Sequence, residues 1–443
     1  MNILLVSFEA APYAKTGGLG DVAGSLPKAL NALGADCRVL MPKFRGTEAR
    51  QVSYDYVNLS WRRQYCGLET AVSGGVTYYF VDNEYYFGRE NVYGYDDDGE
   101  RAAFFSKCAA ELLDRLPGFQ PDVVHCNDWH AALTPLWMRL QGQREGTVLT
   151  IHNLRFQGAC PEAAAGDLLG LDGNAWAMEQ LRWQGGLNFL KAGILTAGRV
   201  TTVSPSYAAE ICGPEYGEGL DGILRLRQGD LRGILNGIDP AAWRSEQPKA
   251  AAKAALQAEL GLDLRADAPL LGMVSRLTEQ KGVELVLETA ARWFAAEGQL
   301  AVLGTGWDQY EAAFRGLERD YPGSMAACIR FDEGLSRRIY AGADGILAPS
   351  YFEPCGLTQM YAMCCGALPV VRATGGLRDS VRDGEDGFVF QEPSADGLWS
   401  ALERVRSAYG TAAWGELNRR ALKRDFSWAK SAAEYLKLYE SLS

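Results

Sequence analysis

The sequence predicts an α/β protein with two Rossmann-like halves, each a parallel sheet flanked by helices. Three observations lead to this fold class. Short apolar runs bounded by glycine, proline or polar residues alternate with helical stretches, which is typical of βαβ units. The runs suit strands that are buried on both faces, as in a parallel sheet. The pattern ends near residue 238 and starts again at residue 270, so we expect two facing domains with a deep cleft between them.

The predicted strands can be placed in chain order. In the first half they are Ile3–Phe8, Arg38–Met41, Val123–His125, Val148–His152 and Arg199–Ser204. In the second half they are Leu270–Val274, Leu300–Gly304, Cys328–Phe331, Gly345–Ala348 and Leu368–Val371. We expect an N-terminal domain over 1–238, a linker with one short helix over 239–268, a C-terminal domain over 269–420 and a terminal helix over 421–443. Ligands of such sheets bind beyond the carboxyl ends of the strands.

The charge and composition exclude several kinds of partner. The formal net charge of the 443 residues is −11, and an acidic surface repels nucleic acid and anionic membranes. No apolar stretch approaches the roughly 18 residues that span a bilayer, and the strand-like start Met1–Val6 lacks the basic region of a signal peptide. The ten cysteines show no C-x-x-C spacing. We therefore expect a reduced, cytoplasmic protein without zinc.

A glycine-rich turn follows the first predicted strand at Lys15–Asp21, which reads KTGGLGD. Its glycines let a ligand approach the backbone, whose amides can point at an anion, and Lys15 adds a positive charge. The alternative is an ordinary β–α turn with incidental glycines. Apolar residues at helical spacing follow. Because Pro27 suits only the first turn of a helix, the regular helix is expected to begin near Ser25.

All three histidines of the chain, His125, His130 and His152, lie at or just after two predicted strand ends. Asp128, Trp129 and His130 together offer an acceptor, a stacking face and a donor, which are the groups that bind a sugar ring. The alternative for each histidine is that it merely caps a strand. Their clustering favours a functional site, and their irregular spacing argues against a metal site.

Two motifs of the second half place charge beside turns. Arg276 and Lys281 lie five residues apart where a strand passes into a helix, within reach of one diphosphate. An equally supported alternative is that both residues are solvated cations on the surface. Glu353 precedes a tight loop, where it would bind sugar hydroxyls beside a phosphate held by the amides of 356–358. The alternative is a capping glutamate.

The sequence resembles the bacterial glycogen synthase and plant starch synthase family nearly end to end. In the first half the matching runs are KTGGLGDV (15–22), YYFVDNEYYFGRENVYG (78–94), HCNDWHAALTP (125–135), TIHNLRFQG (150–158), NFLKAGI (188–194), VSPSYAAEI (203–211) and GILNGID (233–239). In the second half they are VSRLTEQKG (274–282), FEPCGLTQMYAM (352–363) and PVVRATGGLRDSV (369–381). The chain departs from the family in a shortened stretch after Asp239 and in the pair Cys364–Cys365.

The resemblance implies the GT-B fold and the transfer of glucose, usually from ADP-glucose, to the non-reducing 4-hydroxyl of glycogen or another α-1,4-glucan, with retained configuration. It also implies that the terminal helix returns to the first domain. No metal or other cofactor is expected.

The resemblance further implies roles for single residues. The donor-binding residues are Lys15, Gly17, Gly18, Asp21, Asn236, Arg276, Lys281, Phe331, Glu353, Cys355, Gly356, Leu357 and Thr358. Among these, Asn236 and Glu353 would hold glucose hydroxyls and Phe331 would lie against the adenine. The acceptor or sugar site would comprise Glu9, Tyr93, Asp128, Trp129, His130 and Asn153. Catalysis is assigned to Lys15, His152, Arg276, Lys281 and Glu353, with a backbone carbonyl near His152 beneath the sugar C1.

Two alternatives to this function stay open. The same fold would serve UDP-glucose or another acceptor. A weakly catalytic glucan-binding paralogue is the other, and it would be marked by the loss of Lys15, Arg276, Lys281 or Glu353, all of which are present. A dinucleotide-dependent oxidoreductase would need G-x-G-x-x-G directly after the first strand, which this chain lacks. The sequence does not reveal the oligomeric state.

Overall fold

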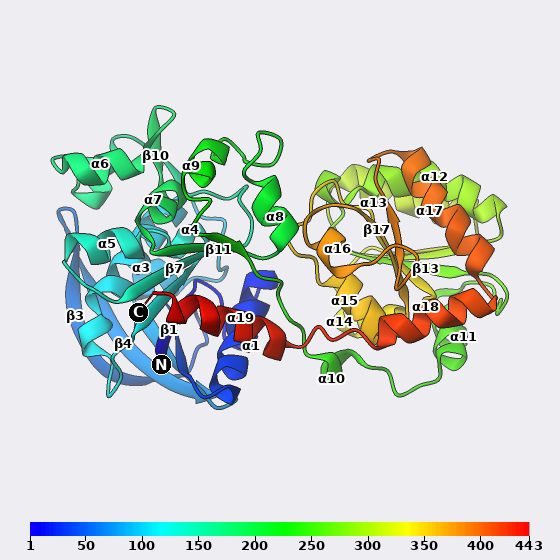
Figure 1. Cartoon of the computed structure of the whole chain (residues 1–443), viewed down its shortest axis with the longest axis horizontal. Helices are drawn as coiled ribbons and strands as arrows, with labels where there is room; N and C mark the ends of the chain where they lie inside the picture. The colour runs from blue at the N-terminus through cyan, green and yellow to red at the C-terminus, as the bar shows by residue number, and fades with distance from the viewer. Residues whose placement is uncertain (443) are drawn as a thin grey trace. The chain divides into compact units, whose positions relative to one another are not determined.

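The computed structural model describes residues 1–442, which fold into two compact α/β units (Figure 1). Met1–Gly237 and the segment from Trp428 onward form the N-terminal unit, and Ile238–Ser427 form the C-terminal unit. Each unit has its own central sheet with helices packed against it. None of the helices in residues 1–442 has the length and apolar character needed to cross a bilayer.

A nine-stranded sheet forms the centre of the N-terminal unit. Its strands are β1 (Asn2–Val6), β2 (Asp36–Pro42), β3 (Arg50–Leu59), β4 (Arg62–Ser73), β5 (Val76–Asp82), β6 (Val123–Asn127), β7 (Gly146–Ile151), β11 (Arg199–Thr202) and β12 (Leu231–Gly233). They follow the order β12-β11-β7-β6-β1-β2-β5-β4-β3. The strands from β12 to β5 in this order are parallel, and β4 and β3 extend the sheet as an antiparallel hairpin. A small second sheet contains β8 (Ala159–Pro161), β10 (Gly186–Asn188) and β9 (Arg182–Trp183).

The helices of the N-terminal unit lie between these strands and after the C-terminal unit. They are α1 (Gly18–Ala32), α2 (Glu84–Phe87), α3 (Asp98–Glu111), α4 (Asp128–Ala131), α5 (Thr134–Leu140), α6 (Ala175–Leu181), α7 (Phe189–Thr196), α8 (Pro205–Glu210), α9 (Asp221–Leu226) and α19 (Trp428–Glu440). Helix α1 begins at Gly18, so the predicted start near Ser25 is wrong. Pro27 lies inside the helix, and the burial of Leu19, Val22, Leu26 and Leu30 maintains the helix despite the hydrogen bond that proline removes.

The C-terminal unit is built on a six-stranded parallel sheet in the order β15-β14-β13-β16-β17-β18. The strands are β13 (Leu270–Val274), β14 (Gln299–Leu303), β15 (Met325–Cys328), β16 (Gly345–Ala348), β17 (Leu368–Arg372) and β18 (Phe388–Phe390). The helices are α10 (Pro240–Trp243), α11 (Lys249–Leu260), α12 (Val283–Ala295), α13 (Asp308–Asp320), α14 (Glu333–Gly342), α15 (Thr358–Cys364), α16 (Gly375–Ser380), α17 (Ala395–Ala408) and α18 (Ala412–Leu422). Both sheets agree with the predicted Rossmann-like halves.

The segment 239–268, predicted to be a linker, is instead part of the C-terminal unit. Helix α11 packs against α14, and Leu256 and Leu262 lie in the core of that unit. The ring of Trp243 stacks on Tyr361 with the centroids 3.7 Å apart. Buried apolar contacts therefore fix this segment, although its alanine- and lysine-rich composition is typical of an exposed connection.

Helix α19 completes the core of the N-terminal unit. Trp428, Tyr435 and Tyr439 are buried among the residues that surround the nine-stranded sheet. The hydroxyl of Tyr439 lies 2.8 Å from Nδ1 of His125, whose Nε2 lies 2.6 Å from Oγ1 of Thr150. Burial lowers the pKa of His125 to about 3, so this ring is neutral. His125 therefore attaches α19 to the sheet, and the clustering of histidines does not indicate a functional role for it.

Replacing Tyr439 with phenylalanine is expected to reduce the free energy of unfolding by about 1–3 kcal/mol, because a buried ring nitrogen of His125 loses its partner. Urea unfolding monitored by tryptophan fluorescence measures the change. The matched control is Tyr54→Phe, since the Tyr54 side chain is exposed, and it should alter stability by less than about 0.5 kcal/mol. Equal stability of the Tyr439→Phe variant and the wild type would contradict the role given to His125.

Candidate active site

The segment after β1 is held by the buried carboxylate of Glu9. Oε2 of Glu9 accepts a hydrogen bond from the backbone N–H of Thr16, and Oε1 accepts from the Thr16 hydroxyl at 2.9 Å and from the Tyr93 hydroxyl at 2.7 Å. Glu9 was predicted to bind sugar, but both of its oxygens are already engaged. In this arrangement it positions the glycine-rich turn and the Tyr93 ring.

Aromatic rings form one wall beside Glu9. The ring of His130 stacks on Phe8 with the centroids 4.8 Å apart, and it lies 3.9 Å from Trp129 and 4.9 Å from Tyr93. Nδ1 of His130 is buried without a hydrogen-bond partner in residues 1–442. Burial and the charge of Arg101 lower its pKa to about 3, so the ring is neutral.

Asp128 links the carboxyl ends of β6 and β7. Its backbone adopts a left-handed φ of 55°, and its Oδ1 accepts the backbone N–H of His152 at 2.7 Å. The backbone N–H of Asn153 also donates to this carboxylate. Burial raises the pKa of Asp128 to about 7, against the opposing effect of these two hydrogen bonds. The structure therefore brings together Asp128, Trp129, His130, His152 and Asn153, as the sequence predicts for strands that end side by side.

Asn127 is part of this site and is absent from the residues predicted by sequence. Its Oδ1 lies 2.9 Å from Nε2 of His152, while its amide nitrogen lies 3.3 Å from the carbonyl oxygens of Val6 and His125. Because the amide nitrogen faces two carbonyls, Oδ1 faces His152 and the proton of that ring is on Nε2. The sequence could have indicated Asn127, because this residue directly precedes Asp128 in the same motif.

The activity is expected to fall as the pH decreases through about 7, because protonated Asp128 holds the backbone of His152 and Asn153 less strongly than the carboxylate does. The pKa of each histidine is lowered to about 3, so none of them titrates in this range. The profile of kcat/KM between pH 5.5 and 8.5 measures the effect. Residual activity of an Asp128→Asn variant should lack the inflection, and a wild-type profile that is flat from pH 6 to 8 would contradict it.

No neighbouring side chain covers the backbone of the glycine-rich turn at Gly17 and Gly18 in the described part of the chain. A side-chain atom at Gly17 or Gly18 would meet nothing within 4 Å, and the first turn of α1 receives no side-chain cap. Nζ of Lys15 lies 2.8 Å from Oδ1 of Asp21, and both side chains are partly exposed. Unsatisfied amides at the start of a 15-residue helix, next to a lysine, are suited to an anion.

In the C-terminal unit, Lys281 and Glu353 form a close ion pair. Nζ of Lys281 lies 2.5 Å from Oε2 of Glu353, and the side chains are only 19% and 13% exposed. The hydroxyl of Ser350 donates to the same carboxylate oxygen at 3.2 Å. The sequence predicted that both residues bind the donor but did not predict their contact, because 72 residues separate them.

Backbone packing fixes the loop between Glu353 and α15. Gly356 adopts a left-handed φ of 71°, and a side-chain atom there would lie 2.7 Å from Oε1 of Gln359. The amide nitrogen of Gln359 donates to the carbonyl of Gly356 at 2.8 Å and to the hydroxyl of Ser380 at 2.9 Å, while its Oε1 is buried without a partner among residues 1–442. A small cavity of about 20 Å³ is bordered by Lys281, Ser350, Glu353, Gly356, Thr358 and Gln359.

Three further residues predicted for the donor are Arg276, Phe331 and Asn236. Arg276 follows β13, is exposed and has no carboxylate within ion-pair distance in the described part of the chain. Phe331 follows β15 and is 92% exposed. Asn236 belongs to the N-terminal unit, where its Oδ1 is buried without a hydrogen-bond partner among residues 1–442. An exposed ring and an exposed guanidinium are available to a ligand.

These features define a class of protein. Two Rossmann-like units, with Asp128, Trp129 and His130 after a strand end of one and the Lys281–Glu353 pair in the other, are those of a GT-B glycosyltransferase. Residues 2–226 match the family described as the starch synthase catalytic domain, and residues 261–414 match glycosyl transferases group 1.

Similar proteins identify the particular family. Glycogen synthases of Anoxybacillus flavithermus and Streptococcus pneumoniae are 43% and 44% identical to this chain, covering all of it and 98% and 100% of their own lengths. The solved catalytic domain of starch synthase IV from Arabidopsis thaliana, bound to ADP and acarbose, has a TM-score of 0.90 at 32% identity and covers 100% of this chain and 99% of its own. The chain belongs to the glycogen synthase and starch synthase family, and it is a hexosyltransferase.

Proposed function

We propose that this protein transfers glucose from ADP-glucose to the non-reducing 4-hydroxyl of glycogen or another α-1,4-glucan, releases ADP and retains the anomeric configuration. The observation that carries the proposal is the Lys281–Glu353 pair beside the tight loop at Gly356, which combines a cation for a phosphate with a carboxylate for sugar hydroxyls. The ADP and acarbose bound to the Arabidopsis relative support a nucleotide donor and a glucan acceptor.

The cations act on the leaving group. When the bond from C1 to the diphosphate breaks, negative charge grows on the phosphate oxygens. Lys281, Arg276 and Lys15 stabilise this charge together with backbone amides, and they need no metal ion for it. Loss of one such donor typically lowers the rate by about 10²–10³-fold.

Retention is proposed to proceed without a carboxylate nucleophile. Each carboxylate at the two candidate sites is already engaged: Glu9 by Thr16 and Tyr93, Asp128 by two backbone amides and Glu353 by Lys281. The acceptor hydroxyl then attacks C1 on the face that the diphosphate leaves. The new bond joins the 4-oxygen to C1, and the hydroxyl proton passes to the departing phosphate oxygen. The backbone carbonyl at His152 lies beneath C1 and stabilises its developing positive charge.

The cytoplasm is the proposed location. All ten cysteines are free thiols, which is the state that a reducing compartment maintains. Burial raises the pKa of several of them, and that of Cys365 to about 11, so these thiols are unreactive at neutral pH.

The deciding experiment measures nucleotide release by the purified protein with a glycogen primer and either ADP-glucose or UDP-glucose, with and without EDTA. Primer-dependent ADP release that survives EDTA, and that Lys15→Ala and Glu353→Ala each abolish, is expected. Nucleotide release from UDP-glucose alone would make UDP-glucose the donor in place of ADP-glucose. Glycogen binding without release from either donor would replace the enzyme proposal with a glucan-binding function.

A further inference from the structure

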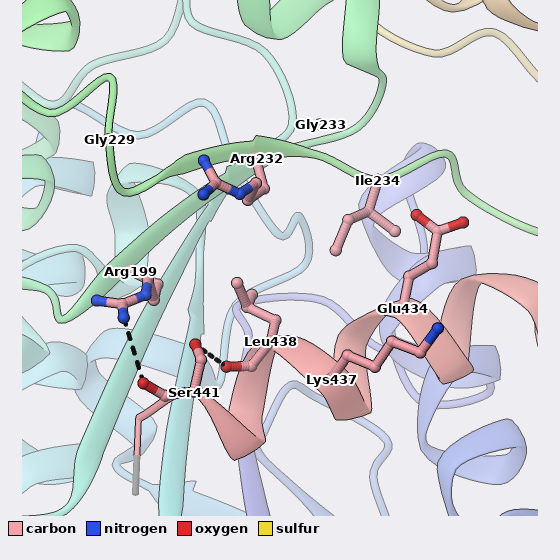
Figure 2. Close-up of a pocket in the computed structure, with 9 residues that line it drawn as sticks. All are labelled: Arg199, Gly229, Arg232, Gly233, Ile234, Glu434, Lys437, Leu438 and Ser441. Carbon is pink, nitrogen blue, oxygen red and sulfur yellow. Dashed lines mark hydrogen bonds between the residues drawn. The ribbon is translucent and has the colours of Figure 1, made fainter.

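A second cavity lies in the N-terminal unit, away from the candidate active site. It has a volume of about 400 Å³ and is bordered by the edge strand β12 and helix α19 (Figure 2). Small-molecule sites usually measure about 300–1,000 Å³, so the cavity is large enough for a ligand of that kind. Arg199 lies at the amino end of β11, whereas the candidate active site is at the carboxyl ends of β6 and β7. The two sites are therefore distinct.

Basic side chains from three elements line this cavity: Arg199 from β11, Arg232 from β12 and Lys437 from α19. Glu434 is the one acidic residue in its lining, and it forms no ion pair with Lys437 within the described part of the chain. Figure 2 shows both arginines on the strand side and Lys437 and Glu434 on the helix side. The cavity therefore carries an excess of positive charge, although the whole protein has a net charge of −11.

The positive charges are only partly neutralised by the protein. Arg199 lies 3.1 Å from Asp230 and donates to the carbonyl of Ser441 at 3.2 Å. Asp230 is shared, because Arg227 also donates to it at 3.1 Å. Among residues 1–442, the Arg232 side chain donates only to the carbonyl of Leu231, at 2.9 Å, and the Lys437 side chain has no hydrogen bond or ion pair. One guanidinium fork and one ammonium group are thus available to an anion.

We propose that this cavity binds a small phosphorylated molecule, with Arg232 and Lys437 holding the phosphate and Arg199 closing the far wall. A guanidinium can bind two phosphate oxygens at once, and the lysine adds a compact charge. The cavity is open to solvent on one side, and its volume of about 400 Å³ suits a phosphate monoester of a sugar-sized molecule. A nucleic acid would instead need an extended basic surface, which an acidic protein does not offer.

The test measures binding of ribose 5-phosphate by isothermal titration calorimetry at constant ionic strength, with ribose as the uncharged probe. The pocket variant is the double substitution Arg232→Gln and Lys437→Gln. Its charge-matched control is Lys423→Gln with Lys430→Gln, since both of these lysines are exposed and lie outside the cavity. Circular dichroism confirms that both variants fold. The Lys281→Ala variant tests whether ribose 5-phosphate binds at the candidate active site instead of in this cavity.

The wild type, the charge-matched control and Lys281→Ala are expected to bind ribose 5-phosphate in a saturable one-to-one manner and to bind no ribose. The pocket variant should bind at least about ten-fold more weakly, because it loses two charged hydrogen-bonding groups. Three results would overturn the proposal: no saturable binding by the wild type, equal binding by the pocket variant, or a loss of binding in Lys281→Ala. Glucosyl transfer is not the readout, so failure here is distinguishable from failure of the proposed enzyme activity.

Discussion

Replacing Lys281 with alanine is expected to lower kcat for glucosyl transfer by about 10²–10³-fold, since the variant loses a cation that stabilises the departing diphosphate. Among residues 1–442 it also leaves the Glu353 carboxylate, which is 13% exposed, with the Ser350 hydroxyl as its remaining side-chain donor. The effect should fall on kcat more than on KM, because the charge on the leaving group grows in the transition state. Steady-state ADP release with a glycogen primer gives both constants.

The matched control for this variant is Lys423→Ala, which removes an exposed lysine from the same unit and should leave both constants within two-fold of wild type, about 0.4 kcal/mol. Lys281→Arg should recover part of the lost rate, because the charge is retained while the geometry changes. A Lys281→Ala variant with unchanged kcat would remove this residue from the proposed mechanism.

Replacing Gly376 with alanine is expected to destabilise the C-terminal unit by about 1–3 kcal/mol or more and to reduce the activity strongly. The added carbon would lie 2.0 Å from the carbonyl oxygen of Cys355, which is backbone and has no rotamer to change. The N–H of Gly376 also donates to the carbonyl of Glu353 at 3.0 Å. A backbone shift at residue 376 therefore moves the carboxylate that pairs with Lys281. Thermal unfolding and the nucleotide-release assay measure the two effects.

Gly415→Ala is the matched substitution. Gly415 lies inside α18, and an added carbon there would meet nothing within 4 Å. Alanine in an open helical position is expected to stabilise the protein by about 0.5–1 kcal/mol and to leave the activity unchanged. If the two variants had the same stability, the close packing of Gly376 against Cys355 would not be a constraint on the loop.

Many of the buried strands could be predicted from sequence, although β5 was missed, and the exposed hairpin β3–β4 could not be predicted. The strands β1, β6, β7, β13, β14 and β17 contain short apolar runs, which suit a sheet covered on both faces. The hairpin β3–β4 has many polar and exposed positions, such as Tyr54 and Arg63, and so gave no such signal. The segment around α11 looked like a linker because its composition is rich in alanine and lysine, whereas Leu256 and Lys253 are in fact buried.

The sequence predicted which residues belong to the candidate site better than it predicted which of them contact each other. Asp128, Trp129 and His152 lie near one another because the parallel strands that precede them end at the same edge of the sheet. The partners of Glu9 and Lys281 could not be predicted, since Tyr93 and Glu353 are 84 and 72 residues away from them along the chain. The clustering of the histidines could not show that His125 has a different role from His152: His125 contacts Tyr439, whereas His152 contacts Asn127.

The position of α19 has a consequence for the order in which this protein folds on the ribosome. Its N-terminal unit takes a core helix from residues that follow the whole C-terminal unit in the chain, so Trp428, Tyr435 and Tyr439 reach it only after that unit has been synthesised. The C-terminal unit, Ile238–Ser427, is a continuous piece and can complete its core first. Domains usually fold in the order of synthesis. Here the unit that is synthesised first is completed last, and until then its sheet lacks the cover that α19 provides.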